Sequence, residues 1–250
     1  VAAATAAGAA EALGEAAALR DLGVYRLRGI AAPERVFQIV APGLATQFPP
    51  LSAPRTVVEN LPGQLASFVG RDAQLETWRA AVTDPNRRLV TLTGFGGIGK
   101  TRTAMQLAQR CADAFADGVW WCEQEAARTG DAMWTLLATQ LRIPLPPTRT
   151  AQAQVVEHLR DRNLLIVLDN TEQIADATVV VRDLLREAPA VSCLVTSRRP
   201  LELRGETVFE LPPLPDDEAV DLFVARATEC VPTFALTPEN RPDIVALCRG

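Results

Sequence analysis

The sequence predicts an α/β fold in which a parallel sheet is covered by helices on both faces. Three observations support this prediction. From residue 65 onward, short apolar runs alternate with segments of helical period. Five of these runs are almost continuously apolar, as expected for strands that are buried on both faces. A glycine-rich segment, GFGGIGKT at 94–101, joins one of these runs directly to a helical pattern.

The individual elements follow from these patterns. We expect strands at 88–93, 119–123, 163–169, 191–197 and 207–211. We expect helices at about 71–82, 100–116, 131–141, 151–161, 173–187 and 216–229, with a last helix running from about 239 to the end. The result is a three-layer α/β/α domain with a five-stranded sheet.

Composition excludes several function classes. The net charge is -5 and the pI is about 5.1, which argues against contact with nucleic acid or an anionic membrane surface by this part of the chain. No apolar run approaches the roughly 18 residues that span a bilayer, so no membrane partner is expected. The five cysteines lack C-x-x-C spacing, which favours a reducing, cytoplasmic location.

A phosphate-binding loop is predicted where the first strand of the sheet meets a helix. Gly94, Gly99, Lys100 and Thr101 match the pattern G-x-x-x-x-G-K-[ST]. Glycines allow the backbone N–H groups to turn inward around phosphates at a helix N-terminus. Lys100 is the only lysine among 25 lysine and arginine residues. A compact ammonium fits between backbone and phosphate oxygens where a planar guanidinium does not.

Acidic and basic residues at the ends of two later strands predict the metal and terminal-phosphate side of the site. Asp169 ends an apolar strand, and together with the hydroxyl of Thr101 it is the expected Mg²⁺ ligand. Asn170 stands where many hydrolytic relatives of this pattern carry a second acid, so hydrolysis is expected to be slow. Glu172 is either a substitute for that acid or a first-turn acid favoured by the helix dipole. Arg198 follows the next strand and is the candidate sensor of a terminal phosphate.

These motifs together resemble those of STAND-class (NB-ARC-like) signalling ATPases, a branch of P-loop NTPases related to AAA+ proteins. The resemblance covers about residues 65–250 and rests on five segments: FVGRD (68–72), GFGGIGKT, LLIVLDNTE, LVTSRRPL and LPPLPDDEAVDLFVARA. It implies ATP or ADP with Mg²⁺ as the bound cofactors. The implied nucleotide-binding residues are Val69, Arg71, Gly94, Gly96, Gly97, Ile98, Gly99, Lys100, Thr101 and Arg102, and the implied catalytic residues are Lys100, Asp169, Glu172 and Arg198.

The resemblance also implies a sheet order of 5-1-4-3-2, which sets the strand before Arg198 between those before Lys100 and Asp169. The domains implied are a nucleotide-binding domain at 65–232 and the start of a helical lid at 233–250. The pattern is most similar to large actinobacterial regulators, in which such an ATPase is joined to sensor and DNA-binding or repeat modules. Other domains of a longer polypeptide and ATP-dependent self-association are therefore the expected interactions.

The N-terminal part has a different composition. Residues 1–45 combine an Ala-rich, helix-like segment with two short strands around Val24 and Val36, which makes a small α+β unit. A Pro-rich linker follows at 46–64. The unit resembles the tail of a class III nucleotide cyclase domain, whose catalytic residues would lie upstream. An unrelated β-hairpin is the alternative.

Three functions are compatible with these features. The first is a nucleotide-dependent switch in a multidomain, transcriptional regulator, with slow ATP hydrolysis. The second is a metabolic P-loop kinase, which needs an acceptor pocket and an arginine-bearing lid. The third is a non-hydrolysing, nucleotide-binding scaffold attached to an adenylate cyclase. The intact Gly99–Lys100–Thr101 segment and Asp169 favour a functional nucleotide site over a scaffold.

Overall fold

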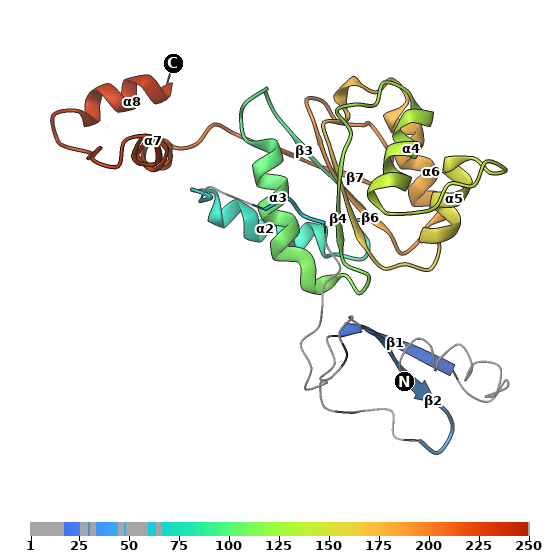
Figure 1. The fold of residues 1–250 in the computed structure, drawn as a ribbon. Coiled ribbons are helices and arrows are strands. Elements are labelled where there is room, and N and C mark those ends of the chain that lie inside the picture. The colour runs from blue at the N-terminus through green and yellow to red at the C-terminus, as the bar shows by residue number, and fades with distance from the viewer. Residues whose placement is uncertain are drawn as a thin grey trace.

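A computed structural model describes residues 18–25, 30, 34–44, 48, 60–63 and 67–249 (Figure 1). The strands are β1 (Ala18–Tyr25), β2 (Glu34–Val40), β3 (Leu89–Thr93), β4 (Val119–Glu123), β5 (Leu165–Asp169), β6 (Ser192–Ser197) and β7 (Glu206–Glu210). The α-helices are α2 (Asp72–Val82), α3 (Lys100–Cys111), α4 (Gly130–Gln140), α5 (Ala151–Leu159), α6 (Ala177–Glu187), α7 (Asp216–Cys230) and α8 (Arg241–Arg249). Short 3-10 turns lie at Ala112–Ala114 (η2) and Thr171–Gln173 (η3).

The central sheet has five parallel strands in the order β4-β5-β6-β3-β7. Numbered within the sheet, this is the order 5-1-4-3-2 that the sequence predicted. Strand β6 therefore lies between β3 and β5, as expected. Because all the strands are parallel, their carboxyl ends meet at one edge, where the predicted phosphate and metal residues follow β3, β5 and β6.

Two hydrophobic cores cover the two faces of the sheet. Figure 1 shows α2 and α3 on one side and α4, α5 and α6 on the other. Successive side chains of a strand point to opposite faces, and β5 illustrates the consequence. Leu165 and Val167 belong to the core beneath α2 and α3, whereas Ile166 and Leu168 belong to the core beneath α4, α5 and α6. Burial on both faces explains why the inner strands are mostly apolar along their whole length.

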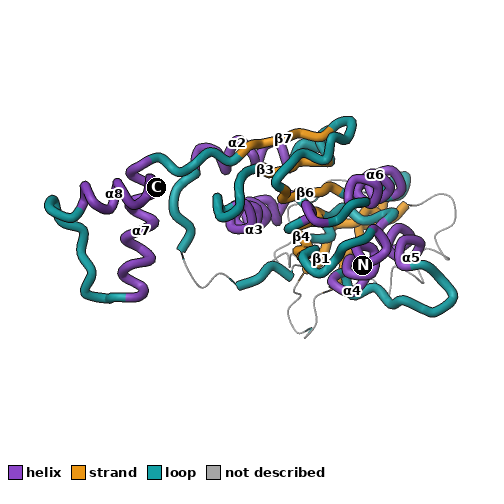
Figure 2. The backbone as a smooth tube through the Cα atoms, turned by 90° about the horizontal axis from the view of Figure 1, so that it is seen from above, coloured by secondary structure: helices purple, strands orange, loops and turns teal. Residues whose placement is uncertain are grey.

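Helices α7 and α8 pack against each other beyond the edge of the sheet (Figure 2). Ion pairs join the start of α7 to α8, including one of 2.6 Å between Arg241 Nη2 and Asp217 Oδ1. Phe223 on α7 makes an edge-on contact with Phe234, with ring centroids 6.0 Å apart. The acids that begin α7 thus serve as first-turn charges and as partners for α8. The predicted boundary between sheet domain and lid at 232/233 remains a prediction.

The N-terminal pair of strands is an antiparallel hairpin in which Ala18 pairs with Val40 and Tyr25 with Glu34. Strand β1 begins earlier than expected, because its pairing with β2 continues back to Ala18. The Ala-rich segment before it, Leu27 and most of the Pro-rich linker lie outside the described residues. In the part of the chain that the structure describes, no helix is long and apolar enough to cross a membrane.

Candidate functional site

The loop between β3 and α3 takes the conformation that its glycines permit. Gly94, Gly97 and Gly99 have positive φ angles of 150°, 80° and 96°, which residues with a Cβ rarely adopt. Gly94 also leaves little room for one, since an added Cβ would lie 3.0 Å from Ile98 Cγ2. Gly99 is the N-cap of α3 and has no side chain to cap it. The first N–H groups of α3 are therefore available to an anion.

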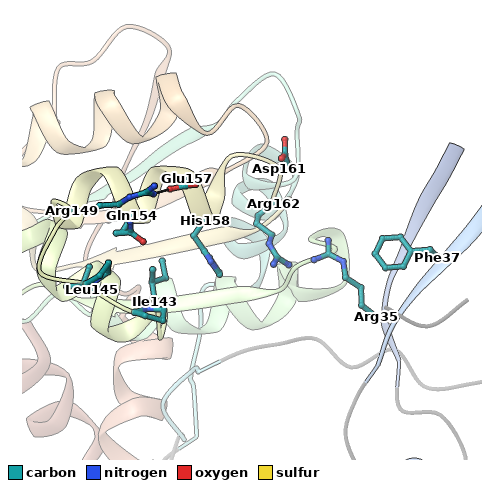
Figure 3. A pocket seen from close by; sticks show the side chains of 12 residues that line it. Arg35, Phe37, Ile143, Leu145, Arg149, Gln154, Glu157, His158, Asp161 and Arg162 are labelled. Carbon is teal, nitrogen blue, oxygen red and sulfur yellow. Dashed lines mark hydrogen bonds and ion pairs between the residues drawn. The ribbon is translucent and has the colours of Figure 1, made fainter. Parts of the chain in front are cut away.

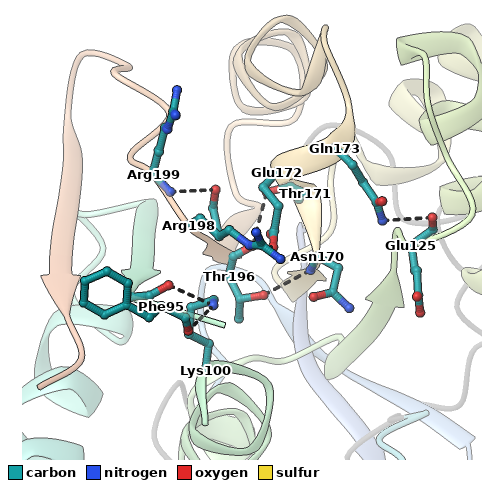
Figure 4. Close-up of polar contacts among 12 residues, drawn as sticks. Phe95, Lys100, Glu125, Asn170, Thr171, Glu172, Gln173, Thr196, Arg198 and Arg199 are labelled. Atoms are coloured by element: carbon teal, nitrogen blue, oxygen red, sulfur yellow. Dashed lines mark hydrogen bonds and ion pairs between the residues drawn. The ribbon is translucent and has the colours of Figure 1, made fainter. Parts of the chain in front are cut away.

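Lys100 is 8% exposed and folds back over this loop. Its Nζ donates hydrogen bonds to the carbonyl oxygens of Gly94 and Phe95, both at 3.0 Å (Figure 4). An ammonium has three N–H groups, and these two bonds use two of them. The buried cation is thus held by neutral carbonyls, with no carboxylate among its hydrogen-bond partners in the described residues. A phosphate is the anion that the loop geometry accommodates.

Asp169 lies at the end of β5, 1% exposed, within reach of the start of α3. The hydroxyl of Thr101 donates to it, at 3.0 Å from both Oδ1 and Oδ2. A second hydroxyl, that of Thr196 on β6, donates to Oδ1. Burial raises the pKa of the Asp169 carboxyl, while both hydroxyl hydrogen bonds lower it and the nearby charges of Glu123 and Glu172 raise it further. Because its hydrogen-bond partners are neutral hydroxyls and its charged neighbours are acids, no positive charge among these groups offsets that of the carboxylate.

Arg198 follows β6 and reaches the same edge. Its guanidinium lies beside the loop: Arg198 Nη2 is 3.9 Å from the position that a Cβ on Gly96 would occupy. Its Nε forms an ion pair of 3.2 Å with Glu172 Oε1, and its side chain is 67% exposed (Figure 4). A cavity of about 710 Å³ adjoins these two residues and Asn170. Glu172 contacts Arg198 by this ion pair, and Asn170 donates its backbone N–H to Thr196 Oγ1 at 3.1 Å.

Arg71 forms the opposite side of the site. It is 3% exposed, has a φ of 65°, and donates from Nη2 to the carbonyl of Ile98 at 3.3 Å. Its Nη1 is buried and has no hydrogen-bond partner among the described residues. Burial lowers the pKa of this guanidinium, and the charge of Glu218 partly offsets that effect. A buried, unsatisfied donor is a strong indication of an absent acceptor.

Arg71 lines a cavity of about 450 Å³ between the loop and helix α7. The other walls are mainly apolar and are formed by Gly97, Ile98, Pro213, Leu214, Ala219, Leu222, Phe223, Arg226, Leu247 and Cys248. A smaller adjoining cavity of about 60 Å³ is lined in part by Val69 and Arg102. Arg102 Nη2 donates to the carbonyl of Ser67 at 3.0 Å. An apolar cavity with a few polar groups is suited to a flat aromatic ring system.

The structure therefore places the predicted residues around the loop between β3 and α3, in two groups on opposite sides of it. Lys100, Thr101, Asp169, Glu172 and Arg198 gather at the carboxyl ends of β3, β5 and β6. Val69, Arg71, Ile98 and Arg102 lie on the side of α7. A ligand that contacts both groups is elongated, with an anionic end and an apolar end.

Two residues of the site were not singled out from the sequence. Glu218 on α7 accepts the backbone N–H of Arg71 at 3.1 Å, and nothing in the spacing of 147 residues indicates this contact. Thr196 was recognisable in principle. It is a polar residue near the end of the mostly apolar run VSCLVTS (191–197), and a polar residue in a buried strand needs a hydrogen-bond partner.

The oxygen donors at Asp169 and Thr101 fit magnesium. Within the described residues, no three His, Cys, Asp or Glu side chains gather as a metal cluster. Magnesium does not require one, because it is usually held by one or two protein oxygens, phosphates and water. Adjacent ligands at about 2.1 Å from an octahedral ion lie about 3 Å apart. The Thr101 and Asp169 oxygens are 3.0 Å apart.

A further cavity lies away from this edge. It measures about 1050 Å³ and lies between the hairpin residues Arg35 and Phe37 and helix α5 (Figure 3). Arg35 Nη1 forms an ion pair of 2.7 Å with Asp117 Oδ1. His158 on α5 lines this cavity, and partial desolvation together with the charge of Arg162 lowers the pKa of its imidazole. None of the predicted site residues lines this cavity.

Comparison with known proteins agrees with this geometry. Residues 73–230 match the family model "NB-ARC domain". An uncharacterized protein of Mycobacterium tuberculosis is 34% identical over 206 residues, which are 81% of this chain and 52% of that protein. A putative HTH-type transcriptional regulator of the same organism is 34% identical over 164 residues, 65% of this chain and 18% of that protein. The regulatory protein AfsR of Streptomyces griseus is 30% identical over 202 residues, 75% of this chain and 20% of AfsR.

Among solved structures, Cdc6p from Pyrobaculum aerophilum aligns with a TM-score of 0.53 and 23% identity, over 68% of this chain and 51% of that one. This likeness supports the P-loop NTPase fold. The chain spans about half the length of the curated relatives first named above, and a much smaller part of the two regulators. The matched family model covers more than half of the chain and includes the loop, Asp169 and Arg198. The chain therefore belongs to the NB-ARC family of nucleotide-binding signalling modules.

Proposed function

We propose that this chain is a nucleotide-dependent switch that binds ATP or ADP with Mg²⁺. The observation that carries this proposal is the convergence of Lys100, the Thr101–Asp169 pair and Arg198 on one glycine loop. A second support is the apolar cavity on the other side of the loop, which contains the unsatisfied Nη1 of Arg71. The two ends match the triphosphate and the base of an adenine nucleotide.

Each residue has a role that follows from its chemistry. The N–H groups of the loop and of the start of α3 hold phosphate oxygens. Lys100 exchanges its bonds to the Gly94 and Phe95 carbonyls for bonds to the phosphates, which are stronger because they join opposite charges. Thr101 and Asp169 hold Mg²⁺, which neutralises charge on the terminal phosphates when bound. Arg71 donates from Nη1 to the base or ribose.

Discrimination between ATP and ADP follows from Arg198. Its guanidinium is paired with Glu172 at the surface, where such pairs contribute little to stability. A terminal phosphate next to Gly96 offers Arg198 a more strongly charged partner. Because helix α7 borders the base cavity, binding also joins the loop to α7 and α8. ATP and ADP then stabilise different arrangements to the extent that their contacts differ.

Slow hydrolysis is part of the proposal. Water attacks the terminal phosphorus as the bond from that phosphorus to the bridging oxygen breaks. ADP leaves with the electron pair of that bond, and a proton of the water passes to the released phosphate. Asn170 has no basic group to take a proton from the water. The carboxylate of Glu172 is engaged in the ion pair with Arg198 and is not directed at a water by any contact in the described residues. We expect a turnover below about 1 per second, against a median enzyme value of about 10 per second. Rapid steady-state phosphate release would contradict this part.

The regulatory setting is proposed from the relatives. Two of them are named as transcriptional or regulatory proteins, and both are several times longer than the matched segment. We propose that other domains of a longer polypeptide receive the nucleotide state through α7 and α8. ATP-dependent self-association is the expected means of output. A kinase reaction is not proposed, since the cavity beside Arg198 has no feature in the described residues that favours an acceptor substrate over the terminal phosphate.

Titration calorimetry with ADP and ATP tests the proposal. Lys100→Ala removes two or more charge-assisted bonds to phosphate, each contributing about 1.5–3 kcal/mol. The affinity should fall by at least about 100-fold, since 1.4 kcal/mol corresponds to a factor of ten. The matched control is Arg182→Ala, which removes an exposed cation on α6, outside the lining of both cavities at the loop. Undiminished affinity of Lys100→Ala would refute the site.

A further inference from the structure

Thr196 occupies the centre of the metal side of the site although it faces away from solvent. It lies on β6, is 0% exposed, and is bordered by the ends of β5 and η3. Three hydrogen bonds converge on it. Its hydroxyl donates to Asp169 Oδ1 and accepts the backbone N–H of Asn170 at 3.1 Å, and its carbonyl accepts the hydroxyl of Thr171 at 3.2 Å.

The direction of these bonds is fixed by proton count. The Asn170 N–H can only donate, so the Thr196 oxygen accepts there. An ionised carboxylate can only accept, so the single hydroxyl proton of Thr196 is committed to Asp169. Figure 4 shows the hydroxyl of Thr196 directed toward the backbone of Asn170. The hydroxyl therefore connects the metal-side carboxylate to the turn that follows it.

This connection orients the carboxylate. Thr196 bonds to Oδ1, whereas Thr101 is 3.0 Å from both oxygens. With Oδ1 anchored from the side of β6, rotation about the terminal bond of Asp169 is restricted, and Oδ2 is kept toward Thr101. The same hydroxyl supports Asn170, whose φ of 60° is uncommon for a residue with a side chain.

We infer that Thr196 is a positioning residue for the magnesium-bound nucleotide, acting through Asp169. This inference rests on the proposed function, because it concerns the same site. Groups that hydrogen-bond to a metal ligand fix its orientation, and their loss typically lowers metal affinity or activity by about 10- to 100-fold. A purely structural threonine would stabilise the fold without altering the contribution of magnesium to nucleotide affinity.

The chain provides a matched control for a test. Thr91 on β3 is likewise 0% exposed, and its hydroxyl is buried with no partner among the described residues. Thr91→Val and Thr196→Val make the same change in neighbouring strands of one sheet. The first removes a hydroxyl that bonds to nothing described, whereas the second removes the bonds to Asp169 and Asn170. Thr196→Ser retains a hydroxyl at the original position.

The measurement is the ADP dissociation constant of the 250-residue chain by calorimetry, in excess Mg²⁺ and in excess EDTA. The dissociation constant in EDTA divided by that in Mg²⁺ measures the contribution of the metal to affinity, and a larger ratio means a larger contribution. We expect Thr196→Val to lower this ratio by about 10- to 100-fold while leaving affinity in EDTA nearly unchanged. Thr196→Ser should restore most of the ratio, and Thr91→Val should not alter it. Electron paramagnetic resonance of Mn²⁺ with ADP, in place of Mg²⁺, gives a second readout of the metal site.

Several results would overturn the inference. An unchanged ratio in folded Thr196→Val would do so, as would an equal loss of affinity with and without metal. If Thr196→Val does not fold by circular dichroism, Thr196→Cys replaces it, because a thiol is a weaker donor of similar size. An unchanged ratio in folded Thr196→Cys would likewise overturn the inference. Failure of the unsubstituted chain to bind ADP would instead refute the proposed function, and the inference with it.

Discussion

The turn at Gly70 allows the sharpest test of how the site is held to helix α7. Gly70 has a φ of 79°, and a Cβ added to it would lie 2.3 Å from Glu218 Oε2 and 2.8 Å from Glu218 Cδ. Glu218 Oε2 is also the acceptor of the Arg71 backbone N–H. Gly70→Ala therefore introduces two separate costs, one from the backbone angle and one from displacing Glu218.

The magnitudes can be separated with a control that the chain provides. Gly205 has a φ of 86°, and nothing lies within 4 Å of an added Cβ. Gly205→Ala should thus show the cost of the backbone angle alone, about 1–2 kcal/mol. Gly70→Ala should add the loss of a hydrogen bond to a carboxylate, about 1.5 kcal/mol at the lower limit for partly buried groups. The difference corresponds to about 3–6 °C in melting temperature for a domain of this size.

Thermal and urea unfolding of both variants measure these costs. A second comparison uses Glu218→Ala, which removes the colliding carboxylate. In that background Gly70→Ala should cost no more than Gly205→Ala does, because only the backbone angle remains. Equal destabilisation by Gly70→Ala and Gly205→Ala in the unsubstituted chain would refute the reasoning. It would show that Glu218 does not hold the turn that carries Arg71.

Three further predictions follow from single residues. Arg198→Ala should weaken ATP binding by about 10- to 100-fold, the loss of one charge-assisted bond, and leave ADP binding unchanged, with Arg199→Ala as the control in calorimetry; an equal effect on both nucleotides would contradict the sensor role. Thr91→Val should leave the free energy of unfolding unchanged or raise it by up to about 1 kcal/mol in urea titrations, since its buried hydroxyl has no described partner; a loss above 1 kcal/mol would reveal one. In thiol titration at pH 8, Cys230 should react at once, and Cys111, Cys122 and Cys193 only after unfolding, because burial raises the pKa of the Cys111 and Cys193 thiols to about 12 and that of Cys122 further. Fast reaction of three or more thiols in the folded chain would contradict this.

The fold was predictable because its signals are local in the sequence. Apolar runs identify β3 to β7 within about two residues, since each of these strands is built around consecutive apolar residues. The glycine loop identifies the start of α3 at Lys100 for a similar reason, because the pattern requires a strand before it and a helix after it. The sheet order came from the resemblance to a known family, and the pairing of β6 with both β3 and β5 confirmed it.

What could not be predicted depends on contacts between distant segments. The helix expected from residue 173 begins at Ala177, because Asn170 takes a left-handed conformation and a 3-10 turn follows it. Sequence alone left Glu172 open between two roles. In the structure, Glu172 instead forms an ion pair with Arg198, which follows strand β6. The contact between Arg71 and Glu218 joins segments that share no pattern.

The unfavourable features of this domain are concentrated where the ligand is proposed to bind. Two of the four non-glycine residues with positive φ in the described chain, Arg71 and Asn170, belong to the site. The unsatisfied Nη1 of Arg71, the buried ammonium of Lys100 and the Asp169 carboxylate with its raised pKa add to the cost. Under the proposed function, the nucleotide supplies an anion to Lys100 and an acceptor to Arg71, and Mg²⁺ supplies a cation to Asp169. A ligand at 100 times its dissociation constant stabilises a protein by about 2.7 kcal/mol. Under the proposed function, we expect these groups to make the stability of the domain depend on the nucleotide, which is the property that a switch requires.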